Sequence, residues 1–194
     1  MEIQPIDLKK PTVFILGAGA STDFGFPTGL ELKERIIASD IPSQEFHKLA
    51  KEYGFTPSHI KEFRDALSWT EHSTIDMFLN ELTNFRDIGA FSTAYSLLKI
   101  ESREVDNIFK ARNWYRRIFN CLIERDNTGI VVFVTLNYER SLEHYLYGRI
   151  TSNKGGKAKE TALQRLGKIK IIHPHGSLGQ FPKVRFGDFN KKFK

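Results

Sequence analysis

Three short segments of the chain combine residue types that can bind or cleave a ligand. GAGAS at residues 17–21 supplies glycines that let the backbone approach an anion closely, with helix N–H groups behind them. Asn137 carries an amide that donates and accepts hydrogen bonds without titrating. His175 offers a ring nitrogen that can act as base or donor near neutral pH, and Gly176 leaves space in front of it. These groups suit a ligand that contains a diphosphate.

Each segment also has a purely structural explanation. The glycines suit a tight strand-to-helix turn, Asn137 suits the cap of a following helix, and His175 suits a structural position at a strand end. The loop has Thr22 where the dinucleotide fingerprint has its third glycine, and it lacks the Gly-Lys-Ser/Thr of a P-loop, so an ordinary dehydrogenase or NTPase is disfavoured. His173 and His175 have no third ligand cluster near them in the sequence, so we expect no metal site.

The three segments follow three predicted strands. Apolar, β-branched runs at 12–16, 130–134 and 168–172 each end in a polar or glycine-bearing loop. In open parallel α/β sheets, ligands bind at the carboxyl ends of the strands, because the loops converge there. We therefore expect the three loops to meet at one edge of a parallel sheet.

Helical patterns occupy most of the remaining chain. A helix at 30–37 has a plausible cap at Thr28, and another is expected at 141–146. Amphipathic segments between them predict helices at 44–53, 58–69, 74–85 and, as one long helix, 91–124. We expect a single domain over 1–194, made of a strand, loop and helix over 1–42, a helical insertion over 43–126, and the second and third strands over 127–194.

Composition fits one soluble globular domain. The chain has 194 residues, of which 40% are hydrophobic and 27% charged. No stretch approaches the roughly 20 apolar residues of a membrane span, and the first residues do not resemble a signal peptide. The single cysteine, Cys121, excludes an internal disulfide and a zinc site built from several cysteines. We expect a cytoplasmic protein without a membrane partner.

The net charge of +6 is concentrated in part of the chain. Residues 149–170 contain seven basic side chains against one acid, Glu160, and such a stretch either binds a nucleic acid or forms a solvated basic loop. The seven are Arg149, Lys154, Lys157, Lys159, Arg165, Lys168 and Lys170.

Taken together, the three motifs resemble those of the sirtuin superfamily. GAGAS with GFPTG at 25–29, TLNYE at 135–139 and HGS at 175–177 follow the order and spacing of its Gly-Ala-Gly-x-Ser loop with Gly-Ile-Pro, its Thr-Gln-Asn-Ile-Asp segment and its His-Gly pair. The likeness is closer to the SIR2-like domains of bacterial antiphage defence proteins, whose second motif usually reads Thr-Thr-Asn-Tyr-Asp. The resemblance implies an α/β fold with a Rossmann-like parallel sheet of sirtuin type and a helical insertion.

The resemblance also implies an activity, NAD+ glycohydrolysis to nicotinamide and ADP-ribose without a metal, by the NAD-depleting effector of a defence system. Asn137 would hold the nucleophilic water or the nicotinamide carboxamide, and His175 would bond the ribose hydroxyls or act as a base. Glu139 stands where the family usually has aspartate. The residues implied to bind NAD are Gly17, Ala18, Gly19, Ala20, Ser21, Phe26, Pro27, Thr28, Thr135 and Glu139.

The chain departs from the family in two ways that leave alternatives open. It lacks the four-cysteine zinc module of sirtuin deacylases, which makes protein deacylation the second choice within the family. The alternative from another class is a nucleotide- or nucleic-acid-binding module without turnover. Sirtuin-like sheets continue past the His-Gly pair, whereas we expect the further C-terminal strands to be missing here. The chain is then a piece of a longer protein or a shortened relative that needs a partner. By family analogy we expect a homo-oligomer or a trigger protein.

Overall fold

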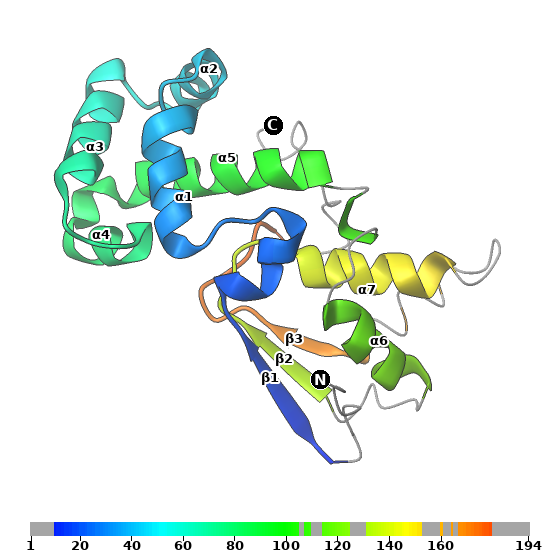
Figure 1. The fold of residues 1–194 in the computed structure, drawn as a ribbon. Helices are drawn as coiled ribbons and strands as arrows, with labels where there is room; N and C mark the ends of the chain where they lie inside the picture. The colour runs from blue at the N-terminus through cyan, green and yellow to red at the C-terminus, as the bar shows by residue number, and fades with distance from the viewer. Residues whose placement is uncertain are drawn as a thin grey trace. The chain divides into compact units, whose positions relative to one another are not determined.

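The computed structural model describes residues 10–104, 107–109, 114–124, 131–152, 160, 164 and 167–179. Over these residues the chain is an α/β protein, mostly helical, with a small three-stranded parallel sheet (Figure 1). It divides into two compact units, and the sheet lies wholly in the first. The first unit is Met1–Phe24 with Glu104–Phe186, and the second is Gly25–Arg103 with Gly187–Lys194.

All three strands of the sheet run parallel, in the order β1-β2-β3. Phe14 pairs with Phe133, and Phe133 pairs with Ile171, so a single register crosses the sheet. The strands are β1 at Thr12–Leu16, β2 at Val131–Thr135 and β3 at Lys170–Ile172. The three predicted strands are confirmed within two residues at each end. Their β-branched and apolar residues favour extended backbone. Their carboxyl ends share one edge of the sheet.

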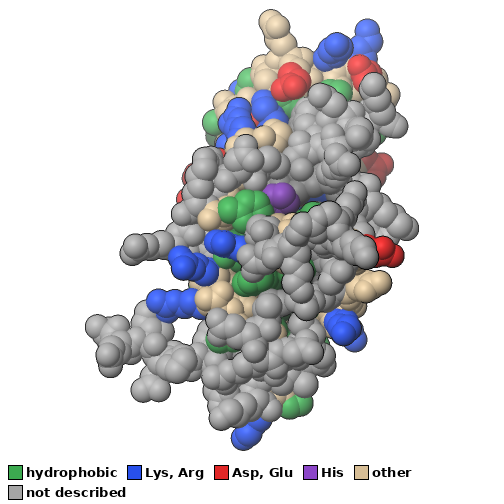
Figure 2. Space-filling model, turned by 90° about the vertical axis from the view of Figure 1, so that its right-hand side faces the viewer, with side chains coloured by type: hydrophobic (Ala, Val, Ile, Leu, Met, Phe, Trp, Pro, Cys, Tyr) green, Lys and Arg blue, Asp and Glu red, His purple; other side chains and the backbone are tan. Residues whose placement is uncertain are grey.

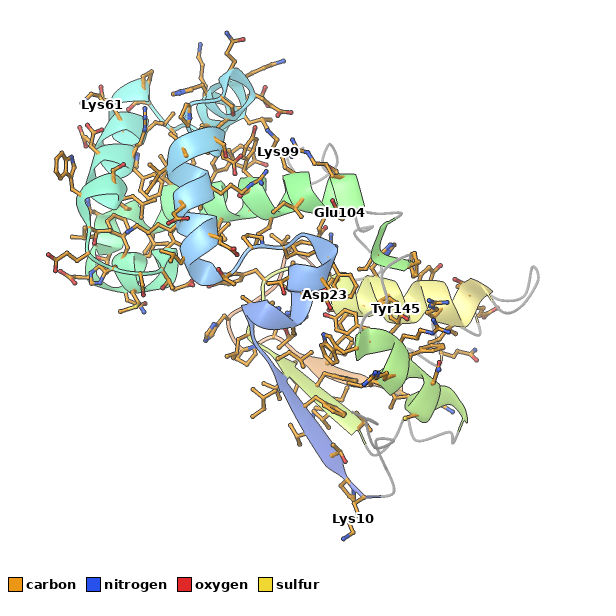
Figure 3. All side chains as sticks on the ribbon, viewed as in Figure 1. Lys10, Asp23, Lys61, Lys99, Glu104 and Tyr145 are labelled. Carbon is orange, nitrogen blue, oxygen red and sulfur yellow. The ribbon has the colours of Figure 1, made fainter. Side chains whose placement is uncertain are left out.

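In the first unit, α6 (Trp114–Glu124) and α7 (Ser141–Ser152) lie on the same side of the sheet (Figure 1). Tyr145 of α7 is fully buried, and its ring centroid lies 5.6 Å from that of Tyr115 on α6 (Figure 3). Tyr115 in turn stacks on Phe24, at 4.7 Å between centroids. This aromatic cluster fixes the segment Ala18–Phe24, a 3-10 helix that follows β1. Position and shape of the loop after β1 therefore depend on packing beneath it.

The single long helix expected over 91–124 is wrong. The structure has α5 at Arg86–Glu104, a short 3-10 turn at Asn107–Phe109, and then α6. Apolar periodicity continues across this region, which is why it predicted one helix. Asparagine, however, competes for backbone hydrogen bonds and favours turns, and Asn107 begins the 3-10 turn that buries Ile108 completely.

The second unit is helical in its described residues, and its first four α-helices begin at polar caps. Thr28 caps the first helix, and its backbone N–H donates to Glu31 Oε2 at 2.7 Å in a capping box, which confirms the predicted helix start. Ser43, Thr56 and Thr74 cap the next three helices. The elements are α1 (Gly29–Arg35), a π-helical turn (Ile36–Asp40), α2 (Gln44–Glu52), α3 (Pro57–Trp69), α4 (Ile75–Glu81), a 3-10 turn (Thr83–Phe85) and most of α5.

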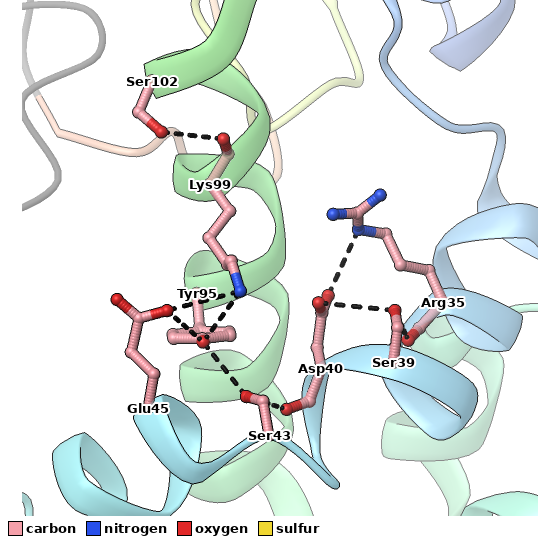
Figure 4. Close-up of polar contacts among 8 residues, drawn as sticks. All are labelled: Arg35, Ser39, Asp40, Ser43, Glu45, Tyr95, Lys99 and Ser102. Carbon is pink, nitrogen blue, oxygen red and sulfur yellow. Dashed lines mark hydrogen bonds and ion pairs between the residues drawn. The ribbon is translucent and has the colours of Figure 1, made fainter.

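A buried tyrosine ties α2 to α5 in the second unit (Figure 4). The Tyr95 hydroxyl donates to Glu45 Oε2 at 2.9 Å and accepts from Lys99 Nζ at 3.2 Å. Ser43, the cap of α2, lies 3.2 Å from the same hydroxyl. The Tyr95 side chain is fully buried and packs against Phe46, so this polar group keeps its partners inside the helical core.

Candidate functional site

The glycine loop after β1 is fixed by its own turn and by α6, and it has free space beside Gly17 and Gly19. Its backbone closes a turn, with Ala20 N–H donating to Gly17 O at 2.9 Å, and Ala20 O accepts from the Trp114 indole at 2.8 Å. Ser21 is buried and donates to Ala18 O at 3.1 Å. A methyl group added at Gly17 or Gly19 would meet no described atom within 4 Å. Neither glycine has a positive φ. Within the described part of the chain, neither packing nor backbone conformation requires glycine at these two positions.

Asn137, at the end of β2, reaches across to this loop. Its Nδ2 lies 3.1 Å from Gly17 O, 3.3 Å from Ser21 Oγ and 3.1 Å from Glu139 Oε1. A carbonyl and a carboxylate can only accept, so these neighbours fix which end of the amide carries the nitrogen. The Asn137 backbone N–H donates to Thr135 Oγ1 at 3.2 Å. Asn137 is only 8% exposed, and the hydrogen bonds described for its side chain all involve Nδ2.

Glu139 performs the capping role that the sequence left open for Asn137. Its Oε2 accepts from the first backbone N–H of α7, at Ser141, while its Oε1 accepts from Asn137. A carboxylate is favourable there because the N-terminus of a helix carries partial positive charge. Burial raises the pKa of Glu139, and the hydrogen bonds from Ser141 and Asn137 offset that shift only in part. The described contacts make Glu139 a support for Asn137.

The two histidines after β3 have different surroundings. The His173 side chain is largely buried; its Nδ1 lies 2.9 Å from Asn137 O, and its Nε2 lies 2.7 Å from Glu143 Oε1 on α7. His175 is exposed, with its ring 6.4 Å from the Tyr138 ring, and Gly176 follows it with a φ of 88°. No described side-chain bond joins His175 to Asn137. Sequence reasoning selected His175 and gave no role to His173.

The structure brings together part of the predicted site. A bonded cluster in the first unit joins Gly17, Ser21, Thr135, Asn137 and Glu139. His175 lies at the same carboxyl edge of the sheet. Phe26, Pro27 and Thr28 belong to the second unit, where Phe26 is buried and Thr28 caps α1.

No family model, curated protein or solved structure matches this chain. Function must therefore be argued from the chemistry of the site itself.

Neither a metal site nor a membrane-spanning helix is found among the described residues. They contain no group of three or more His, Cys, Asp or Glu side chains placed to hold a metal ion. None of their helices combines the length and apolar character needed to cross a membrane. The ring nitrogens of His173 contact the Asn137 carbonyl and Glu143.

Most of the predicted basic stretch lies outside the described residues. Arg149 bonds the Tyr145 hydroxyl at 3.1 Å and lies over its ring, while Lys168 and Lys170 are exposed. On the face drawn in Figure 2, Lys and Arg side chains lie at several separate places. The positions outside the described residues are Lys154, Lys157, Lys159 and Arg165.

Proposed function

We propose that this chain is a SIR2-like NAD+ glycohydrolase that releases nicotinamide and ADP-ribose, and that it acts as the NAD-depleting effector of a bacterial antiphage system. The observation that carries the proposal is the orientation of Asn137. Its amide nitrogen faces three acceptors on the Gly17 loop and Glu139, so the Oδ1 atom is the end that remains for a ligand.

The chemistry of the bond to be cleaved matches such a group. Breaking the nicotinamide–ribose bond builds positive, oxocarbenium-like character on the sugar, so the site has to orient the leaving nicotinamide and place a water. Asn137 Oδ1 would accept a hydrogen bond from that water or from the nicotinamide carboxamide. Since the amide is already oriented by the fold, little ordering remains to be done when the substrate binds.

The glycine loop supports the same proposal. A methyl group at Gly17 or Gly19 meets no described atom, so the two glycines leave room for a ligand to approach the backbone closely. In this proposal the loop holds the diphosphate and inner ribose of NAD+, and His175 bonds the ribose hydroxyls or serves as the base. The three strands are then part of a Rossmann-like sheet of sirtuin type, and the helical unit is its insertion.

The test is nicotinamide release from NAD+, measured by chromatography with and without an acetyl-lysine peptide. We expect release that does not depend on the peptide, and its loss in Asn137→Ala and in His175→Ala. Release only in the presence of the peptide would favour the deacylase alternative. Release that persists unchanged in both variants, or no release at all, would contradict the proposal.

A further inference from the structure

We propose that His173 is a positioning residue for Asn137: held by Glu143, its ring fixes the backbone carbonyl of Asn137 and thereby the direction of the amide beyond it. The inference rests on the proposed function, because it assigns His173 to the reaction that Asn137 would serve.

Asn137 is held at two points by different parts of the first unit. Its side chain is fixed by the Gly17 loop and Glu139, as described above. Its backbone carbonyl lies 2.9 Å from His173 Nδ1, which comes from the segment directly after β3. Loss of the contact to His173 would free the backbone at this residue, and small displacements of an orienting group reduce rates strongly.

Glu143 determines how the His173 ring is held. Its Oε1 lies 2.7 Å from His173 Nε2, and both side chains are largely buried, at 12% and 11% exposure. The other carboxylate oxygen, Oε2, is buried and meets no donor among the described residues. His173 is thus the one described partner of this carboxylate, and the two side chains constrain each other.

The contacts of His173 and Glu143 fix where their protons lie. The Asn137 carbonyl can only accept, so His173 Nδ1 must carry a proton. One further proton lies between Nε2 and Glu143. If that further proton leaves, either Nε2 presents a lone pair to the carboxylate, or the tautomer changes and Nδ1 presents a lone pair to the Asn137 carbonyl. We call the contact of the His173–Glu143 pair with the Asn137 carbonyl the clamp. Either result weakens the clamp on Asn137.

The charged groups that face the ring are both acids, Glu143 in contact and Glu139 nearby. Burial alone lowers the pKa of His173, but the hydrogen bond to Glu143 and the charge of Glu143 outweigh it and raise the pKa above 6.5. The clamp is therefore complete below pH 6.5 and is lost as pH rises through this raised pKa. Reactions that depend on the orientation of Asn137 should decline on the alkaline side.

Two conservative variants separate positioning from mere folding. In Glu143→Gln, the amide NH₂ can donate to Nε2 of a neutral ring. The proton then stays on Nδ1 at high pH, and Nδ1–H still donates to the Asn137 carbonyl. In His173→Asn, the amide nitrogen replaces Nδ1 as donor and does not titrate. We expect both variants to stay within about tenfold of wild-type nicotinamide release and to lose the alkaline decline, whereas His173→Leu falls about 100-fold.

The chain contains a matched control. His72 Nε2 lies 2.7 Å from Glu81 Oε2 in the second unit, so Glu81→Gln removes the same kind of pair at the same distance. We expect Glu81→Gln to keep the wild-type pH profile. An alkaline decline that persists in both Glu143→Gln and His173→Asn would overturn the positioning role.

A second readout does not require turnover. In the isotopically labelled protein, the carbonyl ¹³C signal of Asn137 should titrate with the same midpoint as the His173 ring nitrogens, and Glu143→Gln should abolish that titration. An Asn137 carbonyl that does not respond to His173 overturns the inference even in an active protein. Wild-type protein that shows the coupled titration but releases no nicotinamide would refute the proposed function and leave the clamp standing.

Discussion

The Asn137 amide nitrogen lies 3.1 Å from the Gly17 carbonyl oxygen, which joins two residues 120 positions apart in the sequence. The loop after β1 and the end of β2 are therefore linked at the carboxyl edge of the sheet. Because adjacent parallel strands end at this edge, the contact needs no unusual backbone. It gives Asn137 a defined direction before any ligand binds.

Replacing Asn137 by aspartate should destabilise the protein while leaving its shape almost unchanged. A carboxylate oxygen would then face the Gly17 carbonyl and the Glu139 carboxylate, neither of which can donate to it. We expect a loss of about 1–3 kcal/mol in the free energy of unfolding, measured with denaturant. The exposed Asn120 on α6 is the control, since Asn120→Asp should change that free energy by less than about 0.5 kcal/mol. Equal effects in the two variants would argue against the described amide contacts.

Glu139 should make the stability of the protein depend on pH. Its pKa in the folded state is raised above 4.5 by burial, so its ionised form is less favourable in the folded protein than in the unfolded chain. The stability that it contributes is fully present below pH 4.5 and is lost as pH rises through the raised pKa. Unfolding measured from acid to neutral pH should show this loss in the wild type and not in Glu139→Gln. A difference between the two proteins that stays constant over that range would contradict the assignment.

The two glycines Gly17 and Gly148 should respond oppositely to alanine. At Gly17 an added methyl group meets no described atom, so stability should change by less than about 0.5 kcal/mol, while NAD+ turnover falls about 100-fold. At Gly148 the added Cβ would lie 2.2 Å from Phe109 Cζ. Overpacking there should cost about 1–3 kcal/mol, reduced by the better helix propensity of alanine. Thermal unfolding and nicotinamide release on both variants check this; full activity in Gly17→Ala would remove the role of the loop.

Much of the fold could be predicted because local patterns decide it. The run Val13 to Leu16 and the run Val131 to Val134 are β-branched or apolar and end in polar residues, and the helix caps at Thr28 and Thr74 are residues with known capping chemistry. The break between α5 and α6 was missed, because apolar spacing does not register the turn preference of Asn107.

The site was predictable in part for the same reason. Gly17 and Asn137 closely follow predicted strands, and the loops at the carboxyl ends of parallel strands share one edge of the sheet. The contact between His173 and Glu143 joins residues 30 positions apart on different elements, so no local spacing indicates it. Alternation along an extended chain would place His173 and His175, two residues apart, on the same face, so it does not indicate that only His173 is buried. Their surroundings differ because the chain turns at residues 174–175.

Nucleic-acid binding through the basic stretch can be separated from NAD+ turnover. Replacing Lys154, Lys157 and Lys159 by glutamine should leave nicotinamide release unchanged, because none of the three belongs to the proposed site. Any DNA or RNA affinity should fall and should lose part of its salt dependence, measured by fluorescence anisotropy at two salt concentrations. Loss of turnover together with affinity would instead favour a nucleic-acid-associated module.

The most direct single measurement is the rate of nicotinamide release from NAD+ by wild type, Asn137→Ala and Asn120→Ala, side by side at neutral pH. Our proposal predicts release by wild type and Asn120→Ala, with release by Asn137→Ala at the level of the buffer alone. Equal rates in the two alanine variants, or no release by the wild-type chain, would contradict it.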